Sequence, residues 1–356
     1  MDNQVIVTPE QLDREWLNRV LTRSGELKEG AIREFRVRPL RSDNSSVVIL
    51  ELDYSEDARG ERPASLLLKL CGGEHSPDFG PSEVYYYTRD YVGLADAPLV
   101  KCYDAAYSQE QRRYHLLLQD DLTATHATNW DNVAVGAYNL PVAGGLAVLH
   151  AHWWGAERLQ EMLDSLLPSP TKIQKYLDYN LTGHDSLLVG AGGEFEQTEL
   201  EMANQILTHH PARMLARATD PRGFTLVHGD TNPGNILSPL SGQGRTYLLD
   251  RQPFDWSLTT WLGVSDLAYL LVLWLEPDLR RKLELKVLQH YHQGLLAQGI
   301  RDYSWEQLRE DYKLVVAQCI YVPTEWCIDE KERTNRRWLW TMQLRRVLQA
   351  VEDWGF

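Results

Sequence analysis

The stretch His228-Gly229-Asp230-Thr231-Asn232-Pro233-Gly234-Asn235, followed by Leu248-Leu249-Asp250, decides how this chain is interpreted. Four residues separate Asp230 from Asn235, and Asp250 follows an apolar run that is typical of a strand. Carboxylate and amide oxygens are ligands that hard cations prefer. The stretch therefore predicts one acid, one amide and a second acid that act together around a metal ion.

This spacing is typical of phosphoryl transfer from a nucleotide. In protein kinases, a loop of the form H-R-D-x-x-x-x-N supplies a catalytic base and a metal-binding Asn, and a later Asp holds Mg²⁺ against the phosphates. Gly229 stands where protein kinases carry Arg, so we expect that the substrate is not a protein. We interpret the pattern as that of a small-molecule kinase.

Length and composition agree with this interpretation. The 356 residues are enough for two lobes with sizeable cores. A net charge of −14 argues against a nucleic-acid partner, because phosphate backbones need clustered Lys and Arg. The four cysteines show no C-x-x-C spacing, which indicates reduced thiols and a cytoplasmic location. The polar start lacks the features of a signal peptide, and the apolar run 267–275 is too short to cross a membrane.

Hydrophobic periodicity predicts a β-rich half followed by a helical half. An amphipathic helix is expected to begin at Thr8-Pro9-Glu10-Gln11, and another at Pro81. Strands are expected at residues 35–40, 47–52, 65–70, 99–105 and 113–119, and around the motif at 224–250. Further helices are expected at residues 140–152, 171–181, 198–218, 266–275, 279–297, 305–321 and 336–352.

These elements predict an α+β, bilobal fold of the protein-kinase type. Its N-lobe, residues 1–119, would be a small antiparallel sheet that binds nucleotide. Its larger, mainly helical C-lobe, residues 120–356, would hold the catalytic loop and the acceptor pocket.

Lys69 is a candidate phosphate ligand in the expected N-lobe. It lies within a Leu-rich strand, where a buried charge is costly unless it is paired. In kinases such a Lys contacts the α- and β-phosphates and pairs with a helical Glu. Glu83 is the preferred partner and Glu74 the alternative. A lysine at a sheet edge would be the purely structural explanation.

The chain resembles the aminoglycoside- and choline-kinase-like phosphotransferases, and especially the ecdysteroid-kinase-like branch, over roughly residues 35 to 325. The HGD-x4-N loop is shared across the superfamily. The branch is suggested by segments that are similar to its own: Asp250-Arg251-Gln252, Ser42–Val47, Glu83-x-x-Tyr86, Gly294–Ala297 and Tyr303–Trp305.

The resemblance implies ATP and Mg²⁺ as cofactors and a hydroxylated small molecule as acceptor. Asp230 would be the catalytic base, with Asn235 and Asp250 as metal ligands. Further nucleotide-binding residues would be Lys69, Glu83, Asn44, Ser45, Ser46, Gln119 and Asp121. His228 would support the loop from below, and Asp266, otherwise a helix N-cap, would anchor the loop backbone. His150 is expected to be structural rather than a metal ligand.

Two departures from the family pattern leave alternatives open. The loop 41–46 contains no glycine, so its phosphate contacts differ from the usual ones. Arg251 stands where the family usually has an apolar residue, and either alters nucleotide handling or faces solvent. Both motivate a second hypothesis, a nucleotide-binding pseudokinase that acts as an interaction module. Choline, aminoglycoside, macrolide, methylthioribose and steroid-like acceptors all remain open, and so does the oligomeric state.

Overall fold

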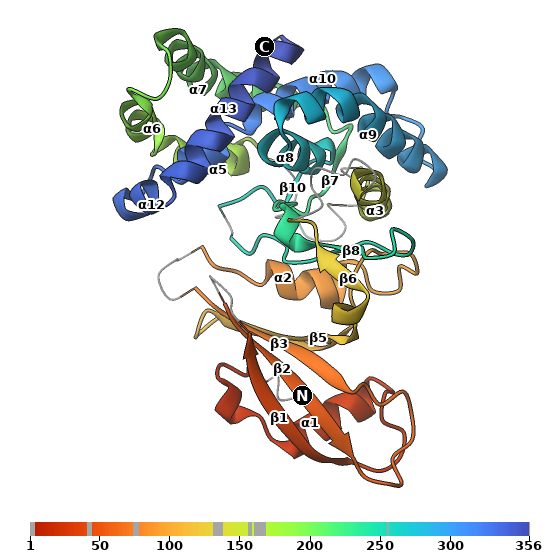
Figure 1. Cartoon of the computed structure of the whole chain (residues 1–356). Coiled ribbons are helices and arrows are strands. Elements are labelled where there is room, and N and C mark those ends of the chain that lie inside the picture. Colours follow the sequence, from red (N-terminus) through yellow and green to blue (C-terminus); the bar gives the residue numbers. More distant parts are fainter. Residues whose placement is uncertain are drawn as a thin grey trace. The chain divides into compact units, whose positions relative to one another are not determined.

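The computed structural model (Figure 1) describes residues 4–40, 45–73, 78–130, 138–155, 159, 169–254 and 256–355, with the backbone alone for Asp121 and Thr123. The chain divides into two compact units. Unit 1 comprises Met1–Ala127 and Ser238–Asp255, and unit 2 comprises Thr128–Leu237 and Trp256–Phe356. The segment that carries Asp250 therefore belongs to unit 1, and the domain boundary at residue 119 stays a prediction.

Unit 1 is built on the antiparallel sheet that the sequence predicts. Five strands run in the order β1-β2-β3-β5-β4. Their bounds are β1 (Ile32–Leu40), β2 (Ser46–Tyr54), β3 (Ser65–Gly72), β4 (Cys102–Ser108) and β5 (Arg113–Gln119). β4 begins at Cys102, later than expected, although the Lys101 carbonyl still accepts a hydrogen bond from the Gln119 backbone at the end of β5.

The first helix, α1 (Arg14–Arg23), covers one side of this sheet and shares a hydrophobic core with β2 and β3. It begins later than expected. The side chain of Gln11 turns back and accepts hydrogen bonds from the backbone of Val7 and Thr8, which closes the short helix η1 (Pro9–Gln11). Asp13 then caps α1 by accepting from the Trp16 backbone at 2.7 Å.

A second helical segment carries two buried acids. α2 (Ser82–Tyr85) continues directly into a π-helical turn, η2 (Tyr86–Asp90). Glu83 and Asp90 are each 1% exposed. Such π-helical turns are rare in proteins overall, but those that occur are often located at functional sites.

The chain then forms η3 (Asp121–Ala124) and a second sheet, in the order β6-β8-β9, from β6 (His126–Thr128), β8 (Ile236–Pro239) and β9 (Tyr247–Leu248). The division into units runs through β6 and β8.

Unit 2 is mainly helical, as expected. Its helices are α3 (Asn139–His152), α5 (Pro170–Leu181), α6 (His184–Ala191), α7 (Gln197–Arg217), α8 (Val264–Trp274), α9 (Pro277–Ala297), α10 (Trp305–Gln318), α11 (Tyr321–Glu325), α12 (Glu330–Asn335) and α13 (Arg337–Trp354). The apolar helix α8 packs against α9, α10 and α13 (Figure 1). The single helix expected at 305–321 ends at Gln318, because Pro323 has no N–H to continue the helical hydrogen bonds.

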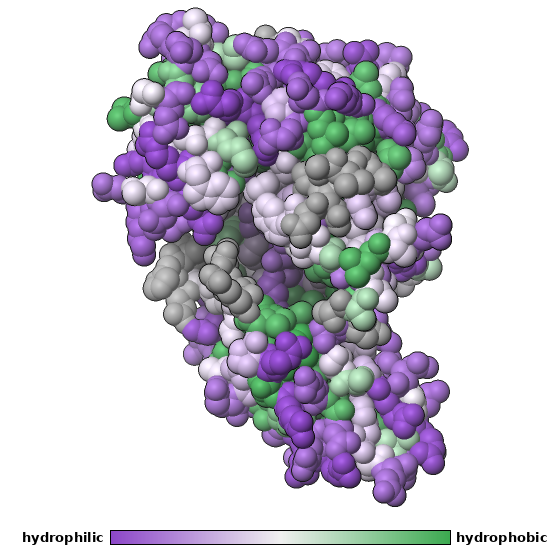
Figure 2. Space-filling view, in the orientation of Figure 1, coloured by the Kyte–Doolittle hydropathy of each residue, from purple (hydrophilic) through white to green (hydrophobic). Residues whose placement is uncertain are grey.

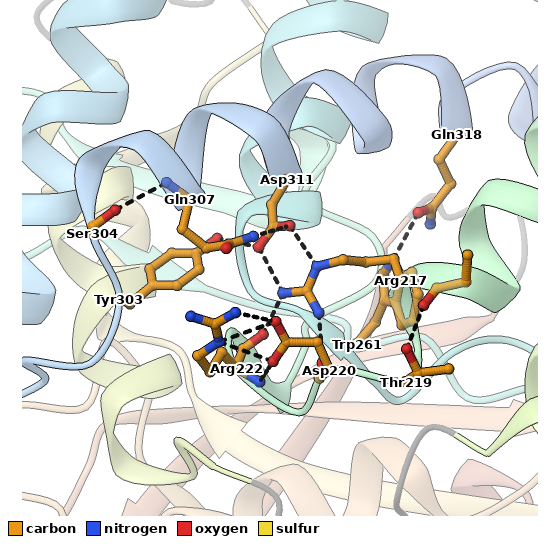
Figure 3. Close-up of polar contacts among 11 residues, drawn as sticks. Arg217, Thr219, Asp220, Arg222, Trp261, Tyr303, Ser304, Gln307, Asp311 and Gln318 are labelled. Carbon is orange, nitrogen blue, oxygen red and sulfur yellow. Dashed lines mark hydrogen bonds and ion pairs between the residues drawn. The ribbon is translucent and has the colours of Figure 1, made fainter.

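Within unit 2, β7 (Phe224–Leu226) pairs with β10 (Thr260–Leu262) and leads into the motif loop. A buried ion-pair network fixes the entry to β7 (Figure 3). Arg217, at the end of α7, donates to both carboxylate oxygens of Asp311 on α10, at 2.6 and 2.9 Å. Tyr303 donates to the same carboxylate at 2.7 Å. The network therefore ties α7, α10 and the turn before β7 together.

Figure 2 shows that hydrophilic side chains cover much of the visible face of the helical unit. In the described ranges, no helix has both the length and the apolar character that a bilayer crossing requires. The run 267–275, which lies largely within the 11 residues of α8, is instead packed in the core of unit 2.

Candidate active site

The motif loop in unit 2 is held by the carboxylate of Asp266. Its Oδ2 accepts a hydrogen bond from the His228 backbone at 2.6 Å, and its Oδ1 accepts from the Gly229 backbone at 2.9 Å. Gly229 has a φ of +80°, a conformation that glycine adopts without steric cost. The N-cap of α8 is Gly263, so Asp266 is not the cap of its own helix. Its side chain is used for the loop instead.

His150 completes this support. Its Nε2 lies 3.1 Å from Asp266 Oδ2, and its Nδ1 lies 2.8 Å from the Tyr291 hydroxyl. Burial disfavours the Asp266 carboxylate, but hydrogen bonding and charge from His150, with smaller contributions from the loop, lower the pKa of Asp266 overall. His150 therefore has a structural role next to the loop, as expected.

Within the loop, two amides orient the carboxylate of Asp230. Asn232 donates to Oδ1 at 2.9 Å, and Asn235 donates to Oδ2 at 3.0 Å. Asn235 also donates to the backbone carbonyl of Asp230, so its amide nitrogen points into the loop. Its amide oxygen is then the atom suited to a cation. His228 is buried, and its Nδ1 accepts from the Asp230 backbone at 3.3 Å.

Two neighbours of Asp230 escaped the sequence analysis. Burial raises the pKa of Tyr269 on α8, and the charge of the Asp230 carboxylate and the hydrogen bond that it accepts from the Tyr269 hydroxyl raise it further. Burial and the Asp230 carboxylate raise the pKa of Glu325, the last residue of α11, to about 8. Tyr269 could have been found, because it follows Asp266 at helical i, i+3 spacing. Glu325 gave no local signal, because only tertiary packing brings it near the loop.

Unit 1 contributes a charged cluster around Lys69. This residue lies on β3, between β2 and β5, which rules out the sheet-edge explanation. Its ammonium lies 2.9 Å from both carboxylate oxygens of Glu83 and 2.5 Å from Asp250 Oδ1. The Tyr114 hydroxyl also donates to Glu83. The helical segment, the central strands and the Asp250 segment therefore meet at one ammonium group.

The electrostatics of the cluster follow from this geometry. Burial alone would lower the pKa of Lys69, but the Glu83 and Asp250 carboxylates outweigh it and raise that pKa. For Glu83 the burial contribution is the larger, and it raises the pKa to about 7. Lys69 is therefore charged at neutral pH, and its contact with a nucleotide phosphate stays a prediction.

Asp250 itself has an unusual backbone. Its φ of +60° lies in the left-handed region that non-glycine residues rarely adopt. Its side chain is 45% exposed, so its carboxylate is accessible to a ligand. The next side chain, Arg251, does not face solvent: it is 4% exposed and forms an ion pair with Asp90.

The remaining candidates are placed as follows. Ser46 begins β2 and Ser45 precedes it, while Gln119 ends β5 and its backbone donates to the Lys101 carbonyl at 2.9 Å. Asn44, Glu74 and the side chain of Asp121 lie outside the described residues. Their roles stay predictions.

The residues present suit a Mg²⁺ site that water and nucleotide complete better than a metal site formed by protein ligands alone. No cluster of three or more His, Cys, Asp or Glu in the described ranges could hold a metal by itself. Mg²⁺ usually takes one or two protein oxygens and completes its shell with water and nucleotide phosphates. Asp250 and the amide oxygen of Asn235 would supply such ligands. Their convergence stays a prediction, because Asn235 belongs to unit 2 and Asp250 to unit 1.

Comparisons with solved structures identify the fold. A choline kinase from Cryptosporidium parvum is similar with a TM-score of 0.57 and 10% identity, over 96% of this chain and 97% of that one. For an aminoglycoside phosphotransferase from Ralstonia eutropha, whose function is given as putative, the values are 0.54 and 12%, over 96% and 98%. Choline kinase LicA from Streptococcus pneumoniae gives 0.51 and 14%, over 95% and 98%. The fold is therefore the protein-kinase-like fold of these enzymes, as expected.

Comparisons of sequence identify the family. None of the curated proteins matches the chain. The sequence profile of the ecdysteroid kinase-like family matches residues 95–301, which is more than half of the chain and includes the motif loop, Asp250 and Asp266. The chain thus belongs to the ecdysteroid kinase-like family of small-molecule kinases.

Proposed function

We propose that this protein transfers the γ-phosphoryl group of ATP, with Mg²⁺, to a hydroxyl group of a small-molecule acceptor. The observation that carries the proposal is the Asp230 carboxylate: two loop amides orient it, and the buried Asp266 carboxylate holds the backbone of the two preceding residues. Family membership and the fold support the same reaction class. An aminoglycoside phosphotransferase of this fold has been solved with GDP and kanamycin, which supports a nucleotide and a hydroxylated amine as ligands.

In the proposed reaction, Asp230 orients the acceptor hydroxyl and accepts its proton as the oxygen attacks the γ-phosphorus. Because the transition state is loose, position and charge matter more than full deprotonation of the hydroxyl. The hydrogen bonds from Asn232 and Asn235 fix both carboxylate oxygens, which limits the rotation of the base.

Lys69 would contact the α- and β-phosphates, since both carboxylate oxygens of Glu83 hold its ammonium in place. Bound Mg²⁺ would neutralise charge on the β- and γ-phosphates. Asp250 and Asn235 are the residues that would hold it.

The acceptor would meet Asp230 from the side of Tyr269 and Glu325, which interact with this carboxylate in unit 2. With a pKa of about 8, Glu325 is mostly protonated at neutral pH and can donate a hydrogen bond to an acceptor oxygen. This favours neutral, oxygen-rich alcohols without excluding amines, because a cationic acceptor would favour the ionised form of Glu325.

The test measures ADP release with a panel of hydroxylated acceptors that includes a choline, an aminoglycoside, a methylthioribose and a steroid alcohol. We expect Asp230→Asn to lower turnover by roughly 10²–10⁴-fold while the affinity for ATP·Mg²⁺ stays within about twofold. Asp278→Asn, an exposed acid-to-amide change in the first turn of α9, is the matched control. Unchanged turnover in Asp230→Asn would exclude Asp230 as the base.

The same panel separates the kinase from the interaction module. Thermal stabilisation by ATP·Mg²⁺ without ADP release on any acceptor would favour the module. One motive for that alternative is weaker now, because Arg251 is engaged in an ion pair within unit 1.

A further inference from the structure

Arg251 is a buried charged residue, and burial of its guanidinium carries a desolvation penalty. Its side chain is 4% exposed and that of Asp90 is fully buried, and the guanidinium donates to Asp90 Oδ2. The Arg251 Nε has no hydrogen-bond partner among the described residues. Buried ion pairs often stabilise a fold less than apolar residues of similar volume would. An incompletely satisfied pair next to Asp250 therefore calls for a reason other than stability.

The position of Asp90 gives that reason. Asp90 ends the helical segment 82–90, the same segment that carries Glu83. Glu83 holds Lys69, Lys69 holds Asp250, and Arg251 follows Asp250 directly. The pair between Arg251 and Asp90 closes a ring of contacts that begins and ends on one short helical segment.

Further contacts fasten the chain on both sides of Asp250 to residues 79–91. The Tyr86 hydroxyl donates to the Leu248 carbonyl at 3.3 Å. The Gly80 backbone donates to the Pro253 carbonyl at 2.9 Å. The rings of Phe79 and Phe254 meet edge to face, with centroids 5.9 Å apart. Asp250 thus lies in the middle of a clamped segment, residues 247–254.

These contacts are needed to stabilise the clamped segment, because the backbone of Asp250 is strained. A non-glycine residue at φ +60° persists only where its surroundings determine it. Lys69 holds one carboxylate oxygen of Asp250, but it constrains the side chain rather than the peptide. Arg251 acts on the peptide that follows, and Arg89 keeps Asp90 oriented by donating to Asp90 Oδ1 at 2.7 Å.

We propose that Asp90 and Arg251 are positioning residues that fix the Asp250 carboxylate for Mg²⁺ and nucleotide phosphate. They replace the apolar contact expected at this position with a directional ion pair. This inference rests on the proposed function for its ligand, but its geometry can be tested in protein without metal or nucleotide.

The first measurement is amide hydrogen exchange of residues 247–254 in metal-free protein. We expect Asp90→Asn and Arg251→Met to accelerate exchange in this segment, and Arg251→Lys to restore part of the protection. Arg280→Met is the control, because Arg280 is equally buried and ion-paired but lies in unit 2. Exchange in 247–254 that is unchanged, or accelerated equally in the control, would overturn the proposal.

The second measurement is the ratio of ATP affinities with Mg²⁺ and with EDTA. We expect Asp90→Asn to reduce the gain from Mg²⁺ by about tenfold or more, as loss of an outer-shell partner does at metal sites. If Asp90 acts through Arg251, Asp90→Asn causes no further reduction of the Mg²⁺ gain when Arg251→Met is already present. A full additional loss in that background would contradict the positioning role. If wild-type protein gains no ATP affinity from Mg²⁺, the proposed function fails, and the exchange experiment still decides the geometry.

Discussion

Asp266→Asn should damage both the stability and the turnover of this protein, and the structure sets the size of the effect. The carboxylate accepts two backbone N–H groups and faces His150. An Asn side chain keeps one acceptor oxygen, so at least one of these donors meets an NH₂ group and loses its partner. A hydrogen bond to a buried charged group contributes about 1.5–3 kcal/mol. We therefore expect the free energy of unfolding to fall by at least that amount.

Turnover should fall by a larger factor than the affinity for ATP. A shift of the loop backbone moves Asp230, and a misplacement of about 1 Å costs roughly a hundredfold in rate. Urea unfolding gives the stability and ADP release gives the rate. The control is Asp278→Asn, which makes the same chemical change in the first turn of a helix where the side chain is 88% exposed. A stability loss no larger than in this control, with turnover within about twofold of wild type, would refute the anchoring role.

The pH dependence of stability tests whether the folded state favours the ionised form of Asp266. The pKa of Asp266 is lowered from its usual 3.8, so the folded state favours the ionised form. Its contribution to stability is present above about pH 4 and is lost as the pH falls through the lowered pKa. The stability gap between wild type and Asp266→Asn should therefore narrow in acid.

Three further predictions concern stability. Asp311→Asn should cost about 3–5 kcal/mol in urea unfolding, because it removes the carboxylate that is ion-paired with the largely buried Arg217; a loss below about 1 kcal/mol would contradict this. The pKa of Glu325 is raised to about 8, so its contribution is present below pH 4.5 and is lost up to about pH 8. Glu325→Gln should therefore gain stability relative to wild type as the pH rises over that window, and a constant difference would disprove the shift. Replacing the Lys69 cluster by apolar residues should leave stability equal or raise it by about 1–4 kcal/mol while it abolishes turnover, and a clear destabilisation would contradict this; the variant is Lys69→Met, Glu83→Leu, Tyr114→Phe.

The sheet and most helices could be predicted because they follow local periodicity. β1, β2, β3 and β5 coincide with apolar runs bounded by polar turns, and α7 and α9 are long and periodic. The errors have local physical causes. The opening helix begins later than its periodicity predicts because Gln11 closes a separate turn, and the predicted helix at 305–321 is shorter because Pro323 follows it.

The site could be predicted only where its residues share a motif. Asp230, Asn235 and Asp250 follow a spacing, and Lys69 was conspicuous as a charge in an apolar strand. Asp90 and Glu325 have no such signal, because their partners lie far away in sequence: Arg251 is 161 residues from Asp90. Arg251 departs from the family pattern, but the sequence leaves open whether its side chain faces solvent. Burial decides that question, and burial is a tertiary property.

The two ion pairs of unit 1 bear on whether this is an enzyme or an interaction module. Lys69 with Glu83 and Arg251 with Asp90 are both buried; the first pair contacts the Asp250 carboxylate through Lys69, and the second holds the residue that follows Asp250. Such pairs bring little net stability, since the desolvation of each charge offsets the attraction. An interaction module would need the fold of unit 1 but not an accessible carboxylate held at a strained backbone position. A phosphotransferase needs that carboxylate in one place, so the cost of the charges is consistent with catalysis rather than with scaffolding.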